Sequence, residues 1–230
     1  MKKIGLIGGL SWESSQVYYK IINEKVQEYL GGFHSAKCVM DSVDFAEIEL
    51  FQHKNDWSSM SKMMVDSAKN LENAKAELIV LCTNTMHLCS EDIIKNTSIP
   101  FLHIAEATGE TIKEKNIRKV LLLGTKFTME KDFYKDILKN DFGIEVIIPN
   151  ASDREIVNRV IYKELVLGKL EASSKMEYQR IINDSITNGA EGVILGCTEI
   201  PLLIKGDDVN IPVFNTTRIH AESAVEFALK

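Results

Sequence analysis

Two stretches of the sequence place a hydroxyl or a thiol directly after an apolar run. Residues 76–85 read AELIVLCTNT, and residues 190–199 read AEGVILGCTE. A thiol at the end of a buried strand can exchange protons with a ligand, since its ordinary pKa of about 8.5 falls beside a cation or a helix N-terminus. We therefore expect the thiolate of Cys197 to be accessible near neutral pH and to act as a base.

The two stretches align with each other at a spacing of about 114 residues, which indicates an internal repeat. In this alignment Thr83 takes the position of Cys197, and Cys82 takes the position of Gly196. Successive strand residues point to opposite faces. If Cys197 faces a ligand, Thr83 faces one too, and Cys82 is expected to be a buried core residue. A threonine hydroxyl is not ionised at neutral pH, so it can donate or relay a proton but is a poor base.

Further matches extend the repeat over most of the chain. Residues 3–8 (KIGLIG) match residues 119–124 (KVLLLG), and residues 99–101 (IPF) match residues 211–213 (IPV). The three matches occur in the same order in both halves. The sequence therefore predicts two similar lobes whose equivalent loops meet across a cleft, where small ligands commonly bind.

The elements that position these residues are short apolar runs separated by amphipathic stretches. The runs are continuous rather than alternating, which is typical of parallel strands covered on both faces. One helix is predicted around residues 17–26 and stopped by Gly31 and Gly32; another is predicted around residues 60–71, with Asp56 as its N-cap. The predicted strands are residues 4–7, 37–40, 78–82, 101–103, 120–123, 145–148, 193–195 and 212–214.

This alternation predicts an α/β fold with two pseudo-symmetric lobes, each a mostly parallel sheet flanked by helices. We place the first lobe at residues 1–98 plus 212–230 and the second at residues 99–211, with the active site in the cleft between them.

Composition excludes several classes of protein. The 230 residues carry a net charge of −6, which does not favour nucleic acid or an anionic membrane surface as a partner. No apolar run approaches the ~20 residues that span a bilayer. The four cysteines are scattered and the five histidines have no metal-like spacing, so we expect reduced thiols, a cytoplasmic location and no metal. The dinucleotide, Walker and nucleophile-elbow motifs are all absent.

Four stretches together carry a family resemblance: residues 7–14 (IGGLSWES), 82–87 (CTNTMH), 123–129 (LGTKFTM) and 196–199 (GCTE). With these, the chain resembles the aspartate/glutamate racemases of the Asp/Glu/hydantoin racemase superfamily, over essentially its whole length. The family commonly has a cysteine just before the Asn-Thr pair. Because Thr83 stands there, the chain is most similar to the subgroup specific for L-aspartate and L-glutamate. The resemblance implies a small-molecule substrate, a cofactor-independent reaction and a homodimer.

Racemisation needs two acid/base groups flanking the α-carbon, one on each face. The catalytic residues implied by the resemblance are Thr83 and Cys197, with Cys197 removing the α-proton of the L-enantiomer. Donors of hydrogen bonds would stabilise the enediolate-like intermediate that forms without a cofactor. The expected substrate-binding residues are Leu10, Gln52, Asn84, Thr85, Thr125, Glu164, Thr198 and Glu199.

Some of these positions have more specific expected roles. Glu164 would meet the substrate amino group, and Glu199 would orient Cys197. The Arg that some aspartate racemases use to hold a carboxylate is missing, and Thr125 and Lys126 are the candidate substitutes. His87, two residues after Thr85, is either a polarising group or a structural histidine.

Two other functions remain open from the sequence. One is a related enzyme with a single working cysteine, such as a decarboxylase or a cis–trans isomerase of small dicarboxylates. The other is a non-catalytic binder of acidic amino acids, since the loss of one of two bases would leave recognition intact.

Overall fold

All eight predicted strands are present, and they form two separate four-stranded parallel sheets. The computed structural model describes residues 1–230. The strands are β1 (Ile4–Gly8), β2 (Cys38–Ser42), β3 (Leu78–Leu81), β4 (Phe101–Leu102), β5 (Lys119–Gly124), β6 (Glu145–Ile147), β7 (Gly192–Gly196) and β8 (Val213–Asn215). The strand orders β2-β1-β3-β4 and β6-β5-β7-β8 are the same order in each half of the chain. The α/β fold and the repeat are thereby confirmed.

The chain divides into two units that do not follow the boundaries expected from the sequence. Unit 1 is Met1–Ile104 with His220–Lys230, and unit 2 is Ala105–Ile219. The difference comes from strand pairing. Strand β4 pairs with β3 through Ile79↔Phe101, so it stays in unit 1. Strand β8 pairs with β7 through Leu195↔Asn215, so it belongs to unit 2.

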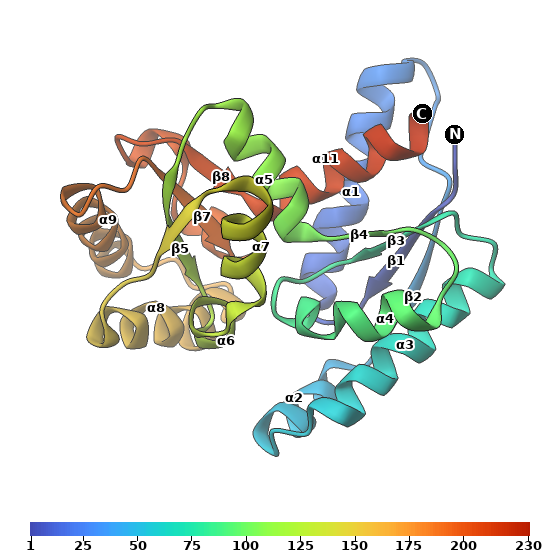
Figure 1. The fold of residues 1–230 in the computed structure, drawn as a ribbon, viewed down its shortest axis with the longest axis horizontal. Coiled ribbons are helices and arrows are strands. Elements are labelled where there is room, and N and C mark those ends of the chain that lie inside the picture. Colours follow the sequence, from blue (N-terminus) through green and yellow to red (C-terminus); the bar gives the residue numbers. More distant parts are fainter. The chain divides into compact units, whose positions relative to one another are not determined.

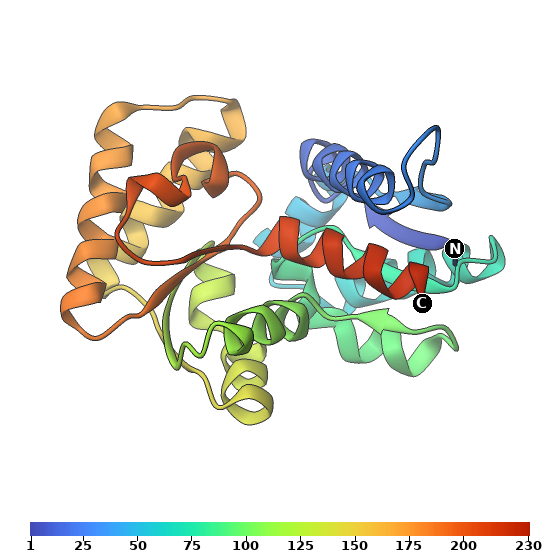
Figure 2. The same cartoon turned by 90° about the horizontal axis from the view of Figure 1, so that it is seen from above.

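In unit 1, helices cover both faces of the sheet (Figure 1). Helices α1 (Trp12–Leu30) and α11 (Thr216–Leu229) lie side by side on one face (Figure 2). Tyr18, Ile22 and Ala224 of these helices belong to the same core cluster as Ile4 and Val80 of the sheet. The other face packs against α3 (Trp57–Asn73), η1 (Thr85–Cys89) and α4 (Ser90–Asn96). Helix α2 (Phe45–His53) follows β2.

The predicted helix ends of unit 1 are also confirmed. Gly31 forms the C-cap of α1, with a φ of 69° that favours glycine. Asp56 is the N-cap of α3 and accepts a hydrogen bond from the Ser59 N–H, 3.0 Å away. Met60 and Met64 of α3 are fully buried and pack in the core of unit 1.

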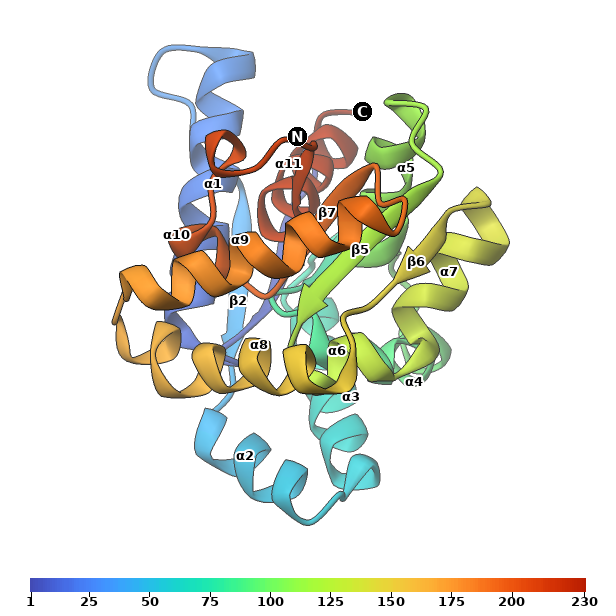
Figure 3. The ribbon, with the colours of Figure 1, turned by 90° about the vertical axis from the view of Figure 1, so that its left-hand side faces the viewer.

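In unit 2, α8 (Ala151–Lys163), α9 (Ala172–Thr187) and α10 (Ile200–Leu203) pack on one face of the sheet, as Figure 3 shows. Helices α5 (Ile104–Glu114) and α7 (Asp132–Phe142) pack together, and the Tyr134 hydroxyl donates to Thr108 Oγ1 at 2.9 Å. The shorter elements are α6 (Lys126–Glu130), η2 (Leu165–Leu167) and η3 (Gly206–Asp208).

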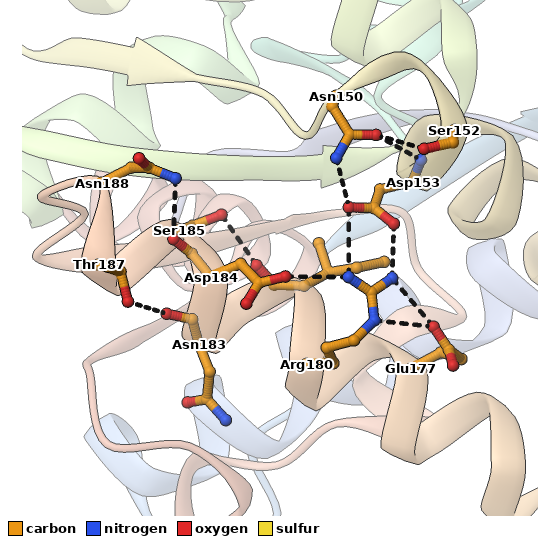
Figure 4. A network of polar contacts seen from close by, with 11 residues as sticks. Asn150, Ser152, Asp153, Glu177, Arg180, Asn183, Asp184, Ser185, Thr187 and Asn188 are labelled. Atoms are coloured by element: carbon orange, nitrogen blue, oxygen red, sulfur yellow. Dashed lines mark hydrogen bonds and ion pairs between the residues drawn. The ribbon is translucent and has the colours of Figure 1, made fainter.

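An arginine on α9 ties that helix to α8 (Figure 4). The Arg180 guanidinium donates to the buried Asp153 carboxylate at 2.5 Å. It also bonds Glu177 and Asp184 on its own helix. Because a buried carboxylate without a partner lowers the stability of the folded protein, this network fixes the position of α9 against α8.

None of the helices combines the length and the apolar character that crossing a bilayer requires.

Candidate active site

The carboxyl ends of three neighbouring strands meet at one edge of the unit 2 sheet. The register pairs Gly124 with Gly196 and Leu195 with Asn215. Residues just after these pairs, including Thr125 and Cys197, therefore share that edge, which is where open α/β sheets bind ligands. A side chain at Gly196 would crowd the neighbouring strand, since an added Cβ would lie 2.9 Å from the Leu123 backbone oxygen.

Cys197 directly follows β7 and is half-buried. Its Sγ donates to Glu199 Oε2 at 2.9 Å. The Thr198 hydroxyl donates to the same oxygen at 2.8 Å. Glu199 therefore holds the thiol and the hydroxyl together.

The surroundings of Cys197 favour the thiol over the thiolate. Burial raises the pKa of Cys197 well above its ordinary value, and the negative charge of Glu199 and its hydrogen bond with the thiol raise this pKa further. The backbone N–H groups of Glu199 and Thr198 act in the opposite direction. These surroundings do not supply the cation that the expected thiolate near neutral pH would need, because the charged group that faces the thiol is an anion.

A buried tyrosine lies behind the thiol. Burial raises the pKa of Tyr178, and the charges of Cys197 and Glu164 raise it too, so these groups share one neighbourhood. The Tyr178 hydroxyl donates to the Val157 carbonyl at 3.0 Å. Glu164 ends α8 and accepts from the Ser174 hydroxyl at 2.5 Å. Tyr178 belongs to no sequence motif. The only signal in the sequence is its position on the apolar face of α9, which indicates burial but no role in the site.

The two candidate substitutes for the missing arginine differ in what they contact. Thr125 is buried and caps α6, where its Oγ1 accepts from the Thr128 N–H at 3.3 Å. Lys126 is ion-paired with Glu155. Since its charge already has a partner, Lys126 is the weaker candidate for holding a substrate carboxylate.

In unit 1, Thr83 follows β3 as Cys197 follows β7. Thr83 is half-buried, and its N–H donates to the Leu81 carbonyl at 2.8 Å in a tight bend. Cys82 is fully buried in the core beneath α1 and α11, and burial raises its pKa. The prediction that Cys82 is a core residue is confirmed.

The other candidates of unit 1 fall into two groups. Asn84 and Thr85 lie in the same turn as Thr83 and begin η1, so the structure brings these three together. Leu10 packs in the apolar core with 6 % exposure. Gln52 is half-buried near the end of α2, and its side chain has no hydrogen bond to the Thr83 turn.

Three buried histidines surround the base of this turn: His87, His103 and His220. Their rings are in contact, with centroids 4.6 Å apart for the first two and 5.5 Å apart for His87 and His220. No group of three or more His, Cys, Asp or Glu side chains is arranged to hold a metal ion. Sequence reasoning missed this cluster, because His220 lies more than a hundred residues from its neighbours.

Comparison with known proteins agrees with this geometry. The family model for "Asp/Glu/Hydantoin racemase" matches residues 7–224. A Yersinia pestis protein proposed to be an Asp/Glu racemase has 50 % identity and a TM-score of 0.96, with all of both chains covered. An aspartate racemase homologue from Pyrococcus horikoshii has 41 % identity and a TM-score of 0.88, again over both whole chains. The broad specificity amino-acid racemase RacX of Bacillus subtilis is 25 % identical over 236 residues, which cover 96 % of each chain.

Proposed function

Since the chain belongs to the Asp/Glu/Hydantoin racemase family, we propose that it racemises an acidic amino acid, L-aspartate or L-glutamate or both, without a cofactor. The observation that carries the proposal is the Cys197 thiol, which ends β7 half-buried and donates to the Glu199 carboxylate at 2.9 Å. The thiol can transfer its proton to the carboxylate, and the thiolate that remains can act as a base.

The proposed reaction begins with the transfer of the Cys197 proton to Glu199. Burial and the Glu199 charge raise the pKa of Cys197, so this transfer is unfavourable when no cation lies near the thiol. The ammonium group of a bound amino acid would add positive charge and make the thiolate more accessible. The thiolate then takes the α-proton of the L-enantiomer, and the α-carbon electron pair moves into the substrate carboxylate as an enediolate.

The product forms when a proton reaches the opposite face of the α-carbon. We assign that step to the Thr83 hydroxyl, which donates its proton and takes another from water. Glu199 releases to water the proton that it took from Cys197, so the hydroxyl, the thiol and the carboxylate are all restored. Asn84, Thr85 and Thr198 are proposed to donate hydrogen bonds to the α-carboxylate. Glu164 is proposed to meet the amino group, and Thr125 to contact the second carboxylate.

Incubation of L-aspartate and L-glutamate in D₂O tests the proposal. We expect deuterium to enter the α-position and the D-enantiomer to appear. Cys197→Ser should abolish both, because a serine hydroxyl is not a base at neutral pH. The matched control is Cys82→Ser, a buried thiol outside the site, which should lower stability but leave exchange intact.

Two results would contradict the proposal and point to the other functions. Tight binding of acidic amino acids without exchange would indicate a binding protein. Release of carbon dioxide from a malonate, or loss of maleate, without exchange would indicate a related single-cysteine enzyme. Thr83→Cys should raise the rate from the D-enantiomer, since it places a second thiol on the return side. The homodimer and the cytoplasmic location stay predictions.

A further inference from the structure

Helix α1 has one exposed face along its whole length. Tyr18, Ile22 and Val26 turn toward the core of unit 1. Because a helix turns by about 100° per residue, the side opposite these residues faces water. We call this side the α1 outer face. It consists of exposed residues at helical spacing, which are Trp12, Gln16, Lys20, Glu24, Gln27 and Leu30.

An open groove of about 730 Å³ runs along the α1 outer face, beside the loop that follows the helix. This loop turns back beside the end of α1 (Figure 1). Tyr19 of the helix and Phe33 of the loop both line the groove. Phe33 is fully exposed, and Tyr19 is 50 % exposed. Aromatic side chains that gather in this way on a surface, with polar residues around them, mark an interaction site.

Hydrogen bonds fix the shape of the groove before anything binds there. Asn23 Oδ1 accepts from the Ala36 N–H at 3.0 Å, and Asn23 Nδ2 donates to the Tyr19 carbonyl at 2.8 Å. The His34 N–H donates to the Gly31 carbonyl at 3.3 Å, which keeps the loop folded against the helix end. A preformed surface loses little conformational freedom when it binds, which favours association.

The residue types of the α1 outer face occur in the same order from either end of the helix. An apolar residue comes first, then a glutamine, then a charged residue. From the start of α1 these are Trp12, Gln16 and Lys20, and from its end they are Leu30, Gln27 and Glu24. All three pairs are centred between positions 21 and 22 or on one of them. A second copy lying antiparallel across this face, on a twofold axis at that centre, therefore meets matching side chains.

The charges of this face favour a second copy over any other partner. Lys20 and Glu24 are 3.7 Å apart within one chain and mostly exposed, so the pair contributes little to the stability of that chain. In the antiparallel arrangement, Lys20 of each copy lies opposite Glu24 of the other, so that two ion pairs form between the copies. The exposed carboxylates Glu13 and Glu28 then fall opposite uncharged residues, and no like charges meet.

We propose that the α1 outer face joins two copies of this chain, with their α1 helices antiparallel and Lys20 of each copy opposite Glu24 of the other. Tyr19 and Phe33 supply apolar area that the contact buries, and the charge pairs set its register. The proposed racemase reaction does not enter this inference. A protein without that activity would still associate through this face.

Charge reversal in the full-length protein tests the pairing. Lys20→Glu or Glu24→Lys places like charges opposite each other twice, and we expect the dissociation constant of the dimer to rise about 100-fold or more. An equimolar mixture of the two variants should form a heterodimer of nearly wild-type affinity. In that mixture one copy carries only carboxylates at positions 20 and 24, and the other carries only ammonium groups. The doubly reversed Lys20→Glu/Glu24→Lys protein should dimerise by itself.

Sedimentation velocity over a series of concentrations gives the dissociation constants. Native mass spectrometry with one variant labelled with nitrogen-15 identifies the heterodimer. Lys95→Glu and Glu91→Lys are the matched controls, because this pair is also exposed and four residues apart, on α4, and they should leave the dissociation constant unchanged. Phe33→Ser should weaken the dimer about tenfold or more, whereas Ile94→Ser, which alters an exposed apolar residue of α4, should not.

Three results would overturn the inference. The first is a wild-type protein that stays monomeric throughout the concentration series. The second is a pair of single variants, Lys20→Glu and Glu24→Lys, that dimerise as the wild type does. The third is a mixture of these two variants that stays monomeric, because an antiparallel contact requires their association.

Discussion

Replacing Glu199 with glutamine should lower the pKa of the Cys197 thiol. The substitution keeps the shape of the side chain but removes the negative charge that faces Sγ at 2.9 Å. It also removes the acceptor that stabilises the thiol, and the new amide can donate to the thiolate. Each of these changes favours the ionised form of Cys197.

Coulomb's law sets the size of the effect. For unit charges 2.9 Å apart, the repulsion is about 6 kcal/mol at an effective dielectric constant of about 20, and about 1.4 kcal/mol in water. One pKa unit corresponds to about 1.4 kcal/mol. Because Glu199 is half-exposed, the water-like end applies more closely. We expect the pKa of Cys197 to fall by about one to two units.

The rate of alkylation by iodoacetamide measures this pKa, since only the thiolate reacts. Peptide mass spectrometry against pH follows Cys197 separately from Cys82 and Cys89, whose burial raises their pKa values, to about 11 for Cys89. Glu191→Gln is the matched control. Glu191 precedes the other end of β7, about 20 Å along the strand and beyond the screening length of physiological salt. An alkylation midpoint that stays constant or rises in Glu199→Gln would refute this reasoning.

Three further predictions concern stability and are measured by urea unfolding. The unfolding free energy should fall by about 2 kcal/mol per buried histidine between pH 7 and pH 5. The folded-state pKa values of His87, His103 and His220 lie below the unfolded value, so the unfolded chain binds protons first as the pH falls. An unfolding free energy that does not change between these pH values would contradict this prediction. Arg180→Met should cost about 2 kcal/mol by leaving Asp153 buried without its cation, whereas Lys95→Met, which breaks an exposed pair, should cost less than about 0.5. Gly9→Ala should cost at least about 2 kcal/mol more than Gly31→Ala, because its Cβ would lie 2.0 Å from a backbone oxygen while Gly31 has open space; equal costs would refute the clash.

The strands and the repeat could be read from the sequence because buried parallel strands are continuous apolar runs. The boundaries of the two units could not be read from the sequence, because hydrophobic periodicity does not show which strands pair. The runs at 101–103 and 212–214 are both present, but the pairs Ile79↔Phe101 and Leu195↔Asn215 assign each to the other unit from the one expected.

The candidate site, like the fold, could be predicted from the sequence only in part. The equivalence of Thr83 and Cys197 follows from the repeat, and the burial of Cys82 follows from strand alternation. The protonation of Cys197 does not follow, because it depends on where the Glu199 side chain points. Tyr178 and the histidine cluster also carry no local signal. Distant segments bring these side chains together, and only the folded chain reveals their contacts.

The return of the chain into unit 1 affects the order in which the protein can fold during synthesis. Residues 220–230 supply Ala221, Ala224, Val225 and Ala228 to the core over β1 and β3. While a ribosome is still making unit 2, helix α1 covers only its own part of this face, and the part beneath α11 stays exposed to water. The first unit to be synthesised is therefore the last to be completed. A nascent chain that stalls before residue 220 exposes apolar sheet surface beside α1, and chaperones or other nascent chains can bind to this surface.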